Sequence, residues 1–264
     1  MERRRRRCVR NGIGFSGNYV RDYWFPHENV VIRENLIEDV PGDGIIVGSC
    51  DGALVEYNVM RDCPDPWGGQ HNAAGGMWPW SSDNTIIQFN EVSGQKATWD
   101  GQGFDADYNC IGTTIRYNYS HDNYGGFLLI CDDGSARKTY SAGNKDTKIY
   151  GNVSYNDGIR PYKRPKDDKW YSPGIHISGP VEDCEVYNNI IYLCERAADL
   201  PKQDKRFIHA NGWAGDPLGV DIRNNLFYSK VRESNFETNS ISTVKFTGNW
   251  YLGISPVAMV SSRD

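Results

Sequence analysis

The stretch Val30-Val31-Ile32-Arg33-Glu34-Asn35-Leu36-Ile37 places apolar residues at fixed distances before and after an asparagine. The same spacing recurs around Asn18, Asn35, Asn58, Asn90, Asn118, Asn152, Asn189, Asn225 and Asn249. An apolar residue stands three positions before each asparagine, namely Phe15, Ile32, Val55, Ile87, Ile115, Ile149, Val186, Ile222 and Phe246. Apolar residues two apart are typical of a short β-strand with one buried face. The recurrence therefore predicts a solenoid with these nine apolar residues stacked inside.

The spacing between successive asparagines varies from 17 to 37 residues. A solenoid tolerates this variation, because extra residues leave the coil as surface loops. An asparagine at the same corner of every turn can hydrogen-bond to its copy in the next turn. We therefore expect an asparagine ladder along the solenoid.

A second strand, opened by glycine, follows the asparagine-anchored strands in most repeats, as in Gly44-Ile45-Ile46-Val47. With these repeats, from about Gly12 to Gly253, the chain resembles the right-handed parallel β-helix proteins of the pectin-lyase-like superfamily. The resemblance implies an all-β, single-stranded right-handed parallel β-helix of about eight or nine turns with long loops on one face. It also implies a carbohydrate-active protein in an extracellular, cell-surface or periplasmic location. The N-T-D, G-H-G and R-I-K signatures of the superfamily's polygalacturonases are absent, so the resemblance assigns no catalytic residue.

Composition agrees with a turn-rich β protein, since the 264 residues include 28 Gly, 16 Tyr and 8 Trp. The net charge of −5 argues against general nucleic-acid binding. No apolar run approaches the roughly 18 residues of a membrane helix, so we expect no membrane insertion. Seven cysteines and five histidines show no metal-ligand spacing, which predicts no metal site.

The repeats divide the chain into three parts. Residues 12–253 are expected to form the β-helix domain, as a fragment of a longer solenoid, and residues 254–264 a C-terminal tail. Residues 1–11, with the basic run Arg3 to Arg7, are expected to be a disordered or artefactual end. They show no signal-peptide pattern, because no apolar segment follows the arginines.

The glycine-opened strands begin at Gly44, Gly76, Gly103, Gly126 and Gly174, and Phe207-Ile208-His209-Ala210 is expected to end their stack. The residue after each glycine is expected to face inward, so the next residue and every second one after it face outward. This alternation predicts an outward face with Trp78, Trp80, Asp105, Asp107, Leu128, Ile130, His176 and Ser178. Long insertions beside the same strands predict the walls of a cleft.

This face predicts a carbohydrate site, because tryptophan rings stack on sugars and carboxylates perform acid–base chemistry. The predicted catalytic residues are Asp105, Asp107 and Asp132. The predicted substrate-binding residues are Trp78, Trp80, His176, Asp133, Asp100 and Arg160. The predicted partner is a polysaccharide or oligosaccharide, and no oligomeric state is predicted.

Three functions stay open. A glycoside hydrolase would use Asp105 and Asp107 without a cofactor, and their Cα separation of about 6.6 Å favours inversion. A lyase acting on a uronic-acid polymer would need Ca²⁺ or another group to neutralise the uronate, and a Lys or Arg base. Asp105-Ala106-Asp107-Tyr108-Asn109 begins like a calcium loop, but Cys110 replaces the glycine that such a loop needs. The third reading is a non-catalytic sugar-binding or adhesin-like solenoid.

Overall fold

The computed structural model of the chain describes residues 11–63, 73–134, 140–165, 167–193, 204, 206–229, 235–238 and 243–253. Residues 1–10 and the expected tail, 254–264, lie outside the described residues. The described part is built of strands, with one short 3-10 helix at Arg21–Tyr23. It contains no helix with the length and apolar character required to cross a membrane.

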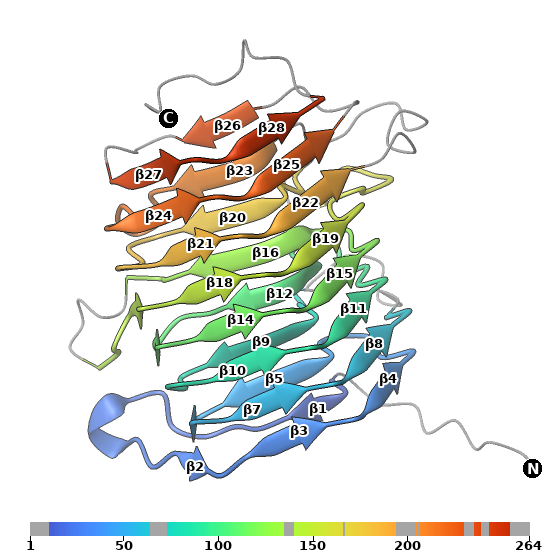
Figure 1. Cartoon of the computed structure of the whole chain (residues 1–264). Helices are drawn as coiled ribbons and strands as arrows, with labels where there is room; N and C mark the ends of the chain where they lie inside the picture. The colour runs from blue at the N-terminus through green and yellow to red at the C-terminus, as the bar shows by residue number, and fades with distance from the viewer. Residues whose placement is uncertain are drawn as a thin grey trace, which may run out of the picture.

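Three parallel sheets of eight strands each run along the molecule (Figure 1). Sheet 1 contains, in order, β1 (Ile13–Gly14), β5 (Ile45–Gly48), β9 (Met77–Trp80), β12 (Gln102–Ala106), β16 (Gly126–Cys131), β20 (Ile175–Ser178), β23 (Arg206–Asn211) and β26 (Asn235–Thr238). Sheet 2 contains β3 (Val31–Arg33), β7 (Leu54–Glu56), β10 (Ile86–Gln88), β14 (Thr114–Arg116), β18 (Lys148–Tyr150), β21 (Glu185–Tyr187), β24 (Val220–Arg223) and β27 (Val244–Thr247). Sheet 3 contains β4 (Leu36–Glu38), β8 (Val59–Arg61), β11 (Glu91–Ser93), β15 (Tyr119–His121), β19 (Val153–Tyr155), β22 (Ile190–Leu193), β25 (Leu226–Ser229) and β28 (Trp250–Leu252).

Two short pairs complete the coil, β2 (His27–Glu28) with β6 (Cys50–Asp51) and β13 (Cys110–Ile111) with β17 (Asn144–Lys145). Successive strands of the chain pass from one sheet to the next, and each strand pairs with its equivalent in the neighbouring turn (Figure 1). This arrangement is the predicted all-β parallel β-helix.

The core of the solenoid contains the predicted apolar stack in sheet 2. Ile115 pairs with Ile87 on one side and Ile149 on the other, and all three are fully buried. The same register links eight of the nine predicted residues, namely Ile32, Val55, Ile87, Ile115, Ile149, Val186, Ile222 and Phe246. Side chains two apart in each strand therefore bury one face of the sheet, as the sequence pattern predicts.

The asparagine ladder joins sheets 2 and 3 along the solenoid. The side-chain amide of Asn118 donates to Oδ1 of Asn152 at 3.0 Å, and the Asn118 backbone N–H donates to the same oxygen at 2.9 Å. Equivalent side-chain bonds of 2.9–3.0 Å continue through Asn35, Asn58, Asn90, Asn118, Asn152, Asn189, Asn225 and Asn249. The ladder satisfies polar groups that the turn would otherwise bury without partners.

The prediction that the first repeat, around Asn18, joins the apolar stack and the asparagine ladder is wrong. Asn18 is exposed, and its Oδ1 accepts from the backbone N–H of Val20 at 3.0 Å instead of joining the ladder. Ile13 pairs with Ile45, so β1 belongs to sheet 1, and Phe15 lies outside the sheet 2 stack. The reason is that Gly12-Ile13 follows the glycine-opened pattern of Gly44-Ile45, which the spacing around Asn18 obscured.

The predicted alignment of β16 is wrong by one residue. Leu128 pairs with Phe104 and is fully buried, whereas Leu129 pairs with Asp105 on the outer face. The cause is the presence of two consecutive glycines, Gly125 and Gly126. Gly125 is the residue equivalent to Gly101 of the preceding turn, and the Gly125 backbone N–H donates to the Gly101 carbonyl at 2.8 Å. A Cβ at Gly125 would lie 1.9 Å from the carbonyl oxygen of Asp100, so this turn requires glycine at that position.

The corrected alignment turns Leu128 and Ile130 into the core and Leu129 and Cys131 toward the outer face. The predicted end of the stack at Phe207–Ala210 is also wrong, because β26 adds a further strand beside β23.

Candidate active site

Two columns of side chains run along the outer face of sheet 1. Alternation along β12, β16, β20 and β23 turns every second residue outward, and parallel pairing sets equivalent residues side by side. The first column consists of Asp105, Leu129, His176 and His209. The second consists of Cys131, Ser178 and Asn211, and Asp107 directly follows β12 beside Cys131. The fold therefore gathers residues from four turns on one surface.

A cavity of about 1070 Å³ lies over this surface. Its sheet lining consists of Asp105, Leu129, Cys131, His176, Ser178, Arg206, His209 and Asn211. Residues outside the strands complete the lining, namely Ala73, Trp99, Asp100, Asp107, Tyr108, Arg164, Lys169, Trp170, Tyr171, Asp204 and Trp213. A volume of this size, with aromatic walls and converging polar groups, is typical of a ligand-binding site.

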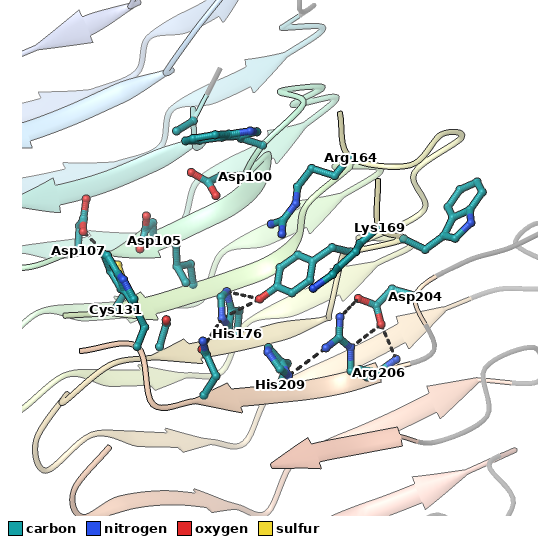
Figure 2. Close-up of a pocket in the computed structure, with 18 of the residues that line it drawn as sticks. Asp100, Asp105, Asp107, Cys131, Arg164, Lys169, His176, Asp204, Arg206 and His209 are labelled. Carbon is teal, nitrogen blue, oxygen red and sulfur yellow. Dashed lines mark hydrogen bonds and ion pairs between the residues drawn. The ribbon is translucent and has the colours of Figure 1, made fainter. Parts of the chain in front are cut away.

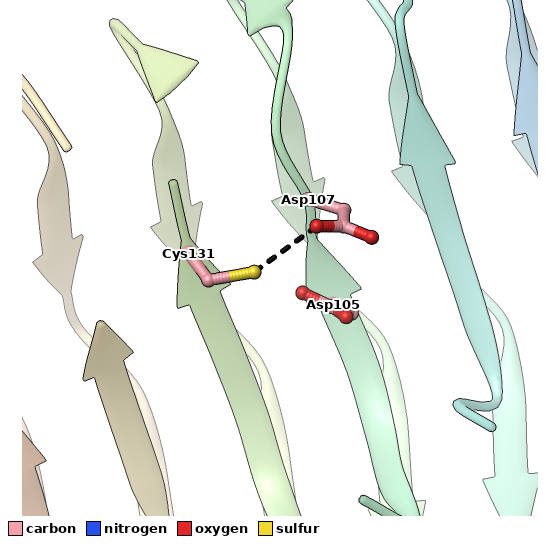
Figure 3. Close-up of side chains that lie close together, drawn as sticks. All are labelled: Asp105, Asp107 and Cys131. Carbon is pink, nitrogen blue, oxygen red and sulfur yellow. Dashed lines mark hydrogen bonds between the residues drawn. The ribbon is translucent and has the colours of Figure 1, made fainter. Parts of the chain in front are cut away.

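Asp105 and Asp107 form a close carboxyl pair at one end of the cavity (Figures 2 and 3). Only 9% of Asp105 and 8% of Asp107 is exposed. One carboxylate oxygen from each, together with Sγ of Cys131, lies within 4.8 Å of the others. Asp107 Oδ1 accepts from the backbone N–H of Tyr108 at 2.8 Å and from the Cys131 thiol at 3.1 Å. Oδ1 of Asp105 is buried and has no hydrogen-bond partner among the described residues.

Burial raises the pKa of both carboxyl groups. The pKa of Asp105 is well above its ordinary value because the group is desolvated and because it faces the charge of Asp107. Desolvation raises the pKa of Asp107 to about 7, against the opposing effect of the Cys131 and Tyr108 hydrogen bonds. Burial and the neighbouring carboxylates hold the pKa of the Cys131 thiol well above its usual range, so this group remains a donor. At neutral pH the pair can therefore hold one transferable proton beside one carboxylate.

His176 is a neutral hydrogen-bonding group in the middle of the cavity. Burial, and then the neighbouring His209, lower the pKa of His176 to about 3. Its Nε2 lies 3.0 Å from Oδ1 of Asn211, which requires a proton on Nε2. The Tyr171 hydroxyl lies 2.7 Å from Nε2 and 3.0 Å from Nδ1, and with the proton on Nε2 it can donate to Nδ1. His176 is thus held in place from two sides without carrying charge.

Comparison with known proteins agrees with this architecture. A family model described as the right-handed β-helix region matches residues 6–227. The chain belongs to the right-handed β-helix family. It is also similar to a lacto-N-biosidase of Bifidobacterium longum subsp. longum, at 30% identity over 188 residues, which are 66% of this chain and 10% of the relative.

Two solved structures share the β-helix fold. A GH136 lacto-N-biosidase from Eubacterium ramulus aligns with a TM-score of 0.54 and 24% identity, over 77% of this chain and 29% of that one. An alginate lyase from Paenibacillus sp. aligns with a TM-score of 0.54 and 13% identity, over 91% of this chain and 75% of that one. This right-handed β-helix therefore spans about a tenth of the Bifidobacterium relative and under a third of the Eubacterium chain.

The β-helix brings four predicted site residues into the cavity, namely Asp105, Asp107, His176 and Asp100. Trp78 and Trp80 do not line it. The indole N–H of Trp78 donates to Asp43 at 2.9 Å, and Trp80 packs edge-on against Tyr19 with ring centres 5.6 Å apart. Both tryptophans face outward as predicted, but they belong to β9, which lies one strand beyond the cavity. Their side chains contact Asp43 and Tyr19 there instead of a ligand site.

Three further predicted residues lie outside the cavity lining. Asp132 accepts from the backbone N–H groups of Gly134 at 2.7 Å and Asn144 at 2.9 Å, which fixes the end of β16. Asp133 follows it and is half-buried. Arg160 is fully buried and donates to backbone carbonyls of the 97–100 segment, including that of Asp100 at 2.8 Å. Arg160 therefore holds in place the segment that carries Asp100, rather than lining the cavity itself.

Sequence reasoning missed part of the lining. His209 occupies the position equivalent to His176, which the aligned repeats already indicated. Trp99, Trp170, Tyr171, Arg206 and Trp213 lie on or next to loops of irregular length, whose direction a repeat pattern does not specify. The signal available was the density of aromatic residues within these insertions.

The described residues that could supply three ligand atoms to a cation are Asp105, Asp107 and Cys131. The calcium-loop reading of residues 105–109 does not fit the structure. Oδ1 of Asn109 accepts from Nε of Arg21 and from the backbone N–H of Ala142, both at 2.8 Å. These bonds occupy the oxygen that would serve as the third ligand of such a loop.

Proposed function

We propose that this β-helix is a glycoside hydrolase that cleaves an oligosaccharide or polysaccharide in the cavity over sheet 1. The observation that carries the proposal is the buried Asp105–Asp107 pair, whose raised pKa values suit proton transfer at neutral pH. The similarity to a lacto-N-biosidase supports a glycan substrate and makes oligosaccharides containing lacto-N-biose the first compounds to test. The reaction needs no metal or cofactor. A substrate of this kind fits an extracellular, cell-surface or periplasmic protein.

The two carboxyl groups take different roles in this proposal. Asp105, whose pKa is raised by burial and one of whose oxygens has no hydrogen-bond partner among the described residues, serves as the acid. Asp107, whose carboxylate accepts two hydrogen bonds, serves as the nucleophile. One oxygen of each carboxyl group lies within 4.8 Å of the other, which suits the separation of a retaining pair, about 5–5.5 Å, better than the roughly 6.5–9.5 Å of an inverting pair. The short separation favours retention, in place of the inversion expected from the Cα spacing.

In the first step, Asp107 attacks the anomeric carbon and forms a glycosyl ester. The glycosidic C–O bond breaks, and the leaving oxygen takes the proton of Asp105. In the second step, Asp105 takes a proton from water while the water oxygen attacks the anomeric carbon. The C–O bond to Asp107 then breaks, which releases the sugar and restores both groups.

A uronate lyase is the second candidate, because Arg164, Lys169 and Arg206 line the cavity and could neutralise a uronate or remove a proton. The products separate the two reactions. A hydrolase releases saturated sugars and new reducing ends, whereas a lyase releases products with an unsaturated uronate that absorbs ultraviolet light. A non-catalytic binding solenoid releases neither.

The test is a product screen on a glycan panel with wild type and the variants Asp105→Asn and Asp107→Asn. Each substitution should lower turnover at least about a hundredfold, since positioned acid–base groups contribute roughly 10²–10⁴. Asp183→Asn is the matched control, because Asp183 is an exposed turn residue with φ of 52°, a conformation that asparagine accepts. A loss of turnover counts only in a variant that is at least as stable as wild type, and full activity in both variants would rule out this pair as the catalytic groups.

A further inference from the structure

The end of the cavity opposite the carboxyl pair gathers hydrogen-bond donors. Figure 2 shows Arg164, Lys169 and Arg206 across the cavity from Asp105 and Asp107. Arg164, Lys169 and Trp170 belong to the segment between β19 and β20, and Arg206 begins β23. The cavity therefore has the carboxyl pair at one end and three cationic side chains at the other.

The two arginines already have acidic partners. Arg164 pairs with Asp167, and Arg206 pairs with Asp204 through bonds of 2.7 and 2.8 Å. Their guanidinium carbons lie 4.1 and 4.9 Å from the centre of the Tyr171 ring, which fixes both arginines against one rigid surface. They shape the positive end of the cavity, but their charges are largely compensated.

Two donors at this end remain available. Lys169 is exposed, and its ammonium makes no hydrogen bond or ion pair within the described part of the chain. The indole N–H of Trp170 is buried and has no partner among the described residues. An unpartnered buried donor is costly, so a ligand that supplies an acceptor here gains that energy on binding. Asp167 and Asp204 are paired with Arg164 and Arg206, so the ammonium of Lys169 is the charge that an anionic acceptor would meet at this end.

We propose that Lys169 and Trp170 form a subsite for an oxyanion, a carboxylate or a sulfate, carried by the saccharide substrate. This inference rests on the proposed function only in taking the ligand to be a saccharide. One oxygen of the anion accepts the indole N–H, while the ammonium of Lys169 compensates its charge. A neutral hydroxyl could accept the indole N–H but would gain little from the ammonium.

The acidic group and the scissile bond belong to different sugar residues. Asp105 and His209 are separated by three strand spacings of about 4.8 Å, or about 14 Å, along the first outward column. A sugar over β20 and β23 can therefore direct its oxyanion to Lys169 and Trp170 while its neighbour reaches the carboxyl pair. Leu129 and the neutral His176 lie between the two ends as a surface for the intervening ring.

The test is equilibrium binding by titration calorimetry. The probes are a glucuronate-containing tetrasaccharide, its carboxyl-reduced neutral counterpart, and a sulfated neutral tetrasaccharide, each with linkages that wild type does not cleave. Wild type should bind at least one acidic probe about tenfold or more tightly than the neutral one, and less tightly at high salt. Which acidic probe binds better identifies carboxylate or sulfate as the recognised group.

Lys169→Gln should weaken binding of the acidic probe several-fold and leave that of the neutral probe unchanged, whereas Trp170→Phe should weaken binding of the acidic probe more than that of the neutral probe. Lys163→Gln is the matched control, since Lys163 lies in the same segment and pairs with Asp168 at 2.6 Å. Equal affinity of wild type for acidic and neutral probes, or an equal loss for both in Lys169→Gln, would overturn the subsite. Because binding is measured without turnover, the subsite can stand if Asp105 and Asp107 prove inactive, and the hydrolase can stand if the subsite fails.

Discussion

The Cys131 thiol is placed to tune Asp107. It donates to Oδ1 at 3.1 Å, and hydrogen bonds to the ionised form lower a carboxyl pKa. Cys131→Ala should therefore raise the pKa of Asp107. The acidic limb of the kcat/KM profile should move up by about 0.5 to 1 pH unit, because the nucleophile must be ionised.

The control for this prediction is Cys131→Ser, in which a hydroxyl restores the donor. Its acidic limb should stay near that of wild type or move to lower pH. Identical profiles for the alanine and serine variants would show that the thiol packs beside Asp107 without affecting its ionisation.

The buried carboxyl pair should also make the fold less stable as pH rises. A pKa raised to about 7 means that the folded protein holds the Asp107 proton more tightly than the unfolded chain does. Stability therefore falls as pH rises from about 4, the unfolded pKa, through about 7. At pH 8 the free energy of unfolding of Asp107→Asn should exceed that of wild type by on the order of a few kcal/mol, which raises its melting temperature, and the difference should shrink near pH 4. Thermal melts at the two pH values measure this, and a variant less stable than wild type at pH 8 would contradict it.

At the scale of single elements, the asparagine ladder is predicted to contribute to stability at every turn. Asn118→Ala removes donors to Asn152 and to the Ile87 carbonyl, and leaves buried partners unsatisfied. The cost should be about 1–3 kcal/mol or more in the free energy of unfolding. Asn18→Ala is the matched control and should change it by less than about 0.5 kcal/mol, since Asn18 is exposed outside the ladder. Denaturant unfolding compares the two, and equal effects would mean that the ladder is not stabilising.

The apolar stack supports the same strands from inside. Ile115 is fully buried between Ile87 and Ile149. Ile115→Ala should cost about 2–5 kcal/mol, from lost burial and from the cavity left behind. A change below about 1 kcal/mol in denaturant unfolding would mean that the neighbouring turns collapse into the space.

The sequence pattern predicts the position and register of the regular strands well, but it predicts the conformation of the turns between them poorly. Ile32 to Phe246 could be aligned because an inward residue and an asparagine at a fixed distance both recur in each turn. Asn18 satisfies the same spacing without making a ladder bond, since spacing alone does not reveal what the side chain contacts. At Gly125-Gly126 two alignments fit equally, and only the close approach of Gly125 to Asp100 distinguishes them.

At the scale of the whole molecule, the cavity residues on the strands of sheet 1 could be predicted from the sequence, whereas those on the segments between strands could not. Asp105, Asp107 and His176 follow from strand alternation, because parallel turns stack equivalent residues. Trp170, Tyr171 and Trp213 come from segments whose direction depends on long-range contacts, and no local pattern encodes these. The bonds of Arg160 to the 97–100 segment are one such contact between two walls. For the same reason Trp78 faces outward as predicted and yet lies outside the cavity.

The most direct test of the central claim is to identify the residue that carries the sugar during turnover. A fluorinated glycoside with an activated leaving group, derived from whichever glycan the panel shows to be cleaved, should accumulate as a covalent ester. Mass spectrometry of the digested protein should place the label on Asp107. The label should persist in Asp105→Asn, because an activated leaving group needs no acid, and should be absent in Asp107→Asn. A label on Asp100 or another carboxylate, or turnover that yields unsaturated products without any label, would contradict this account.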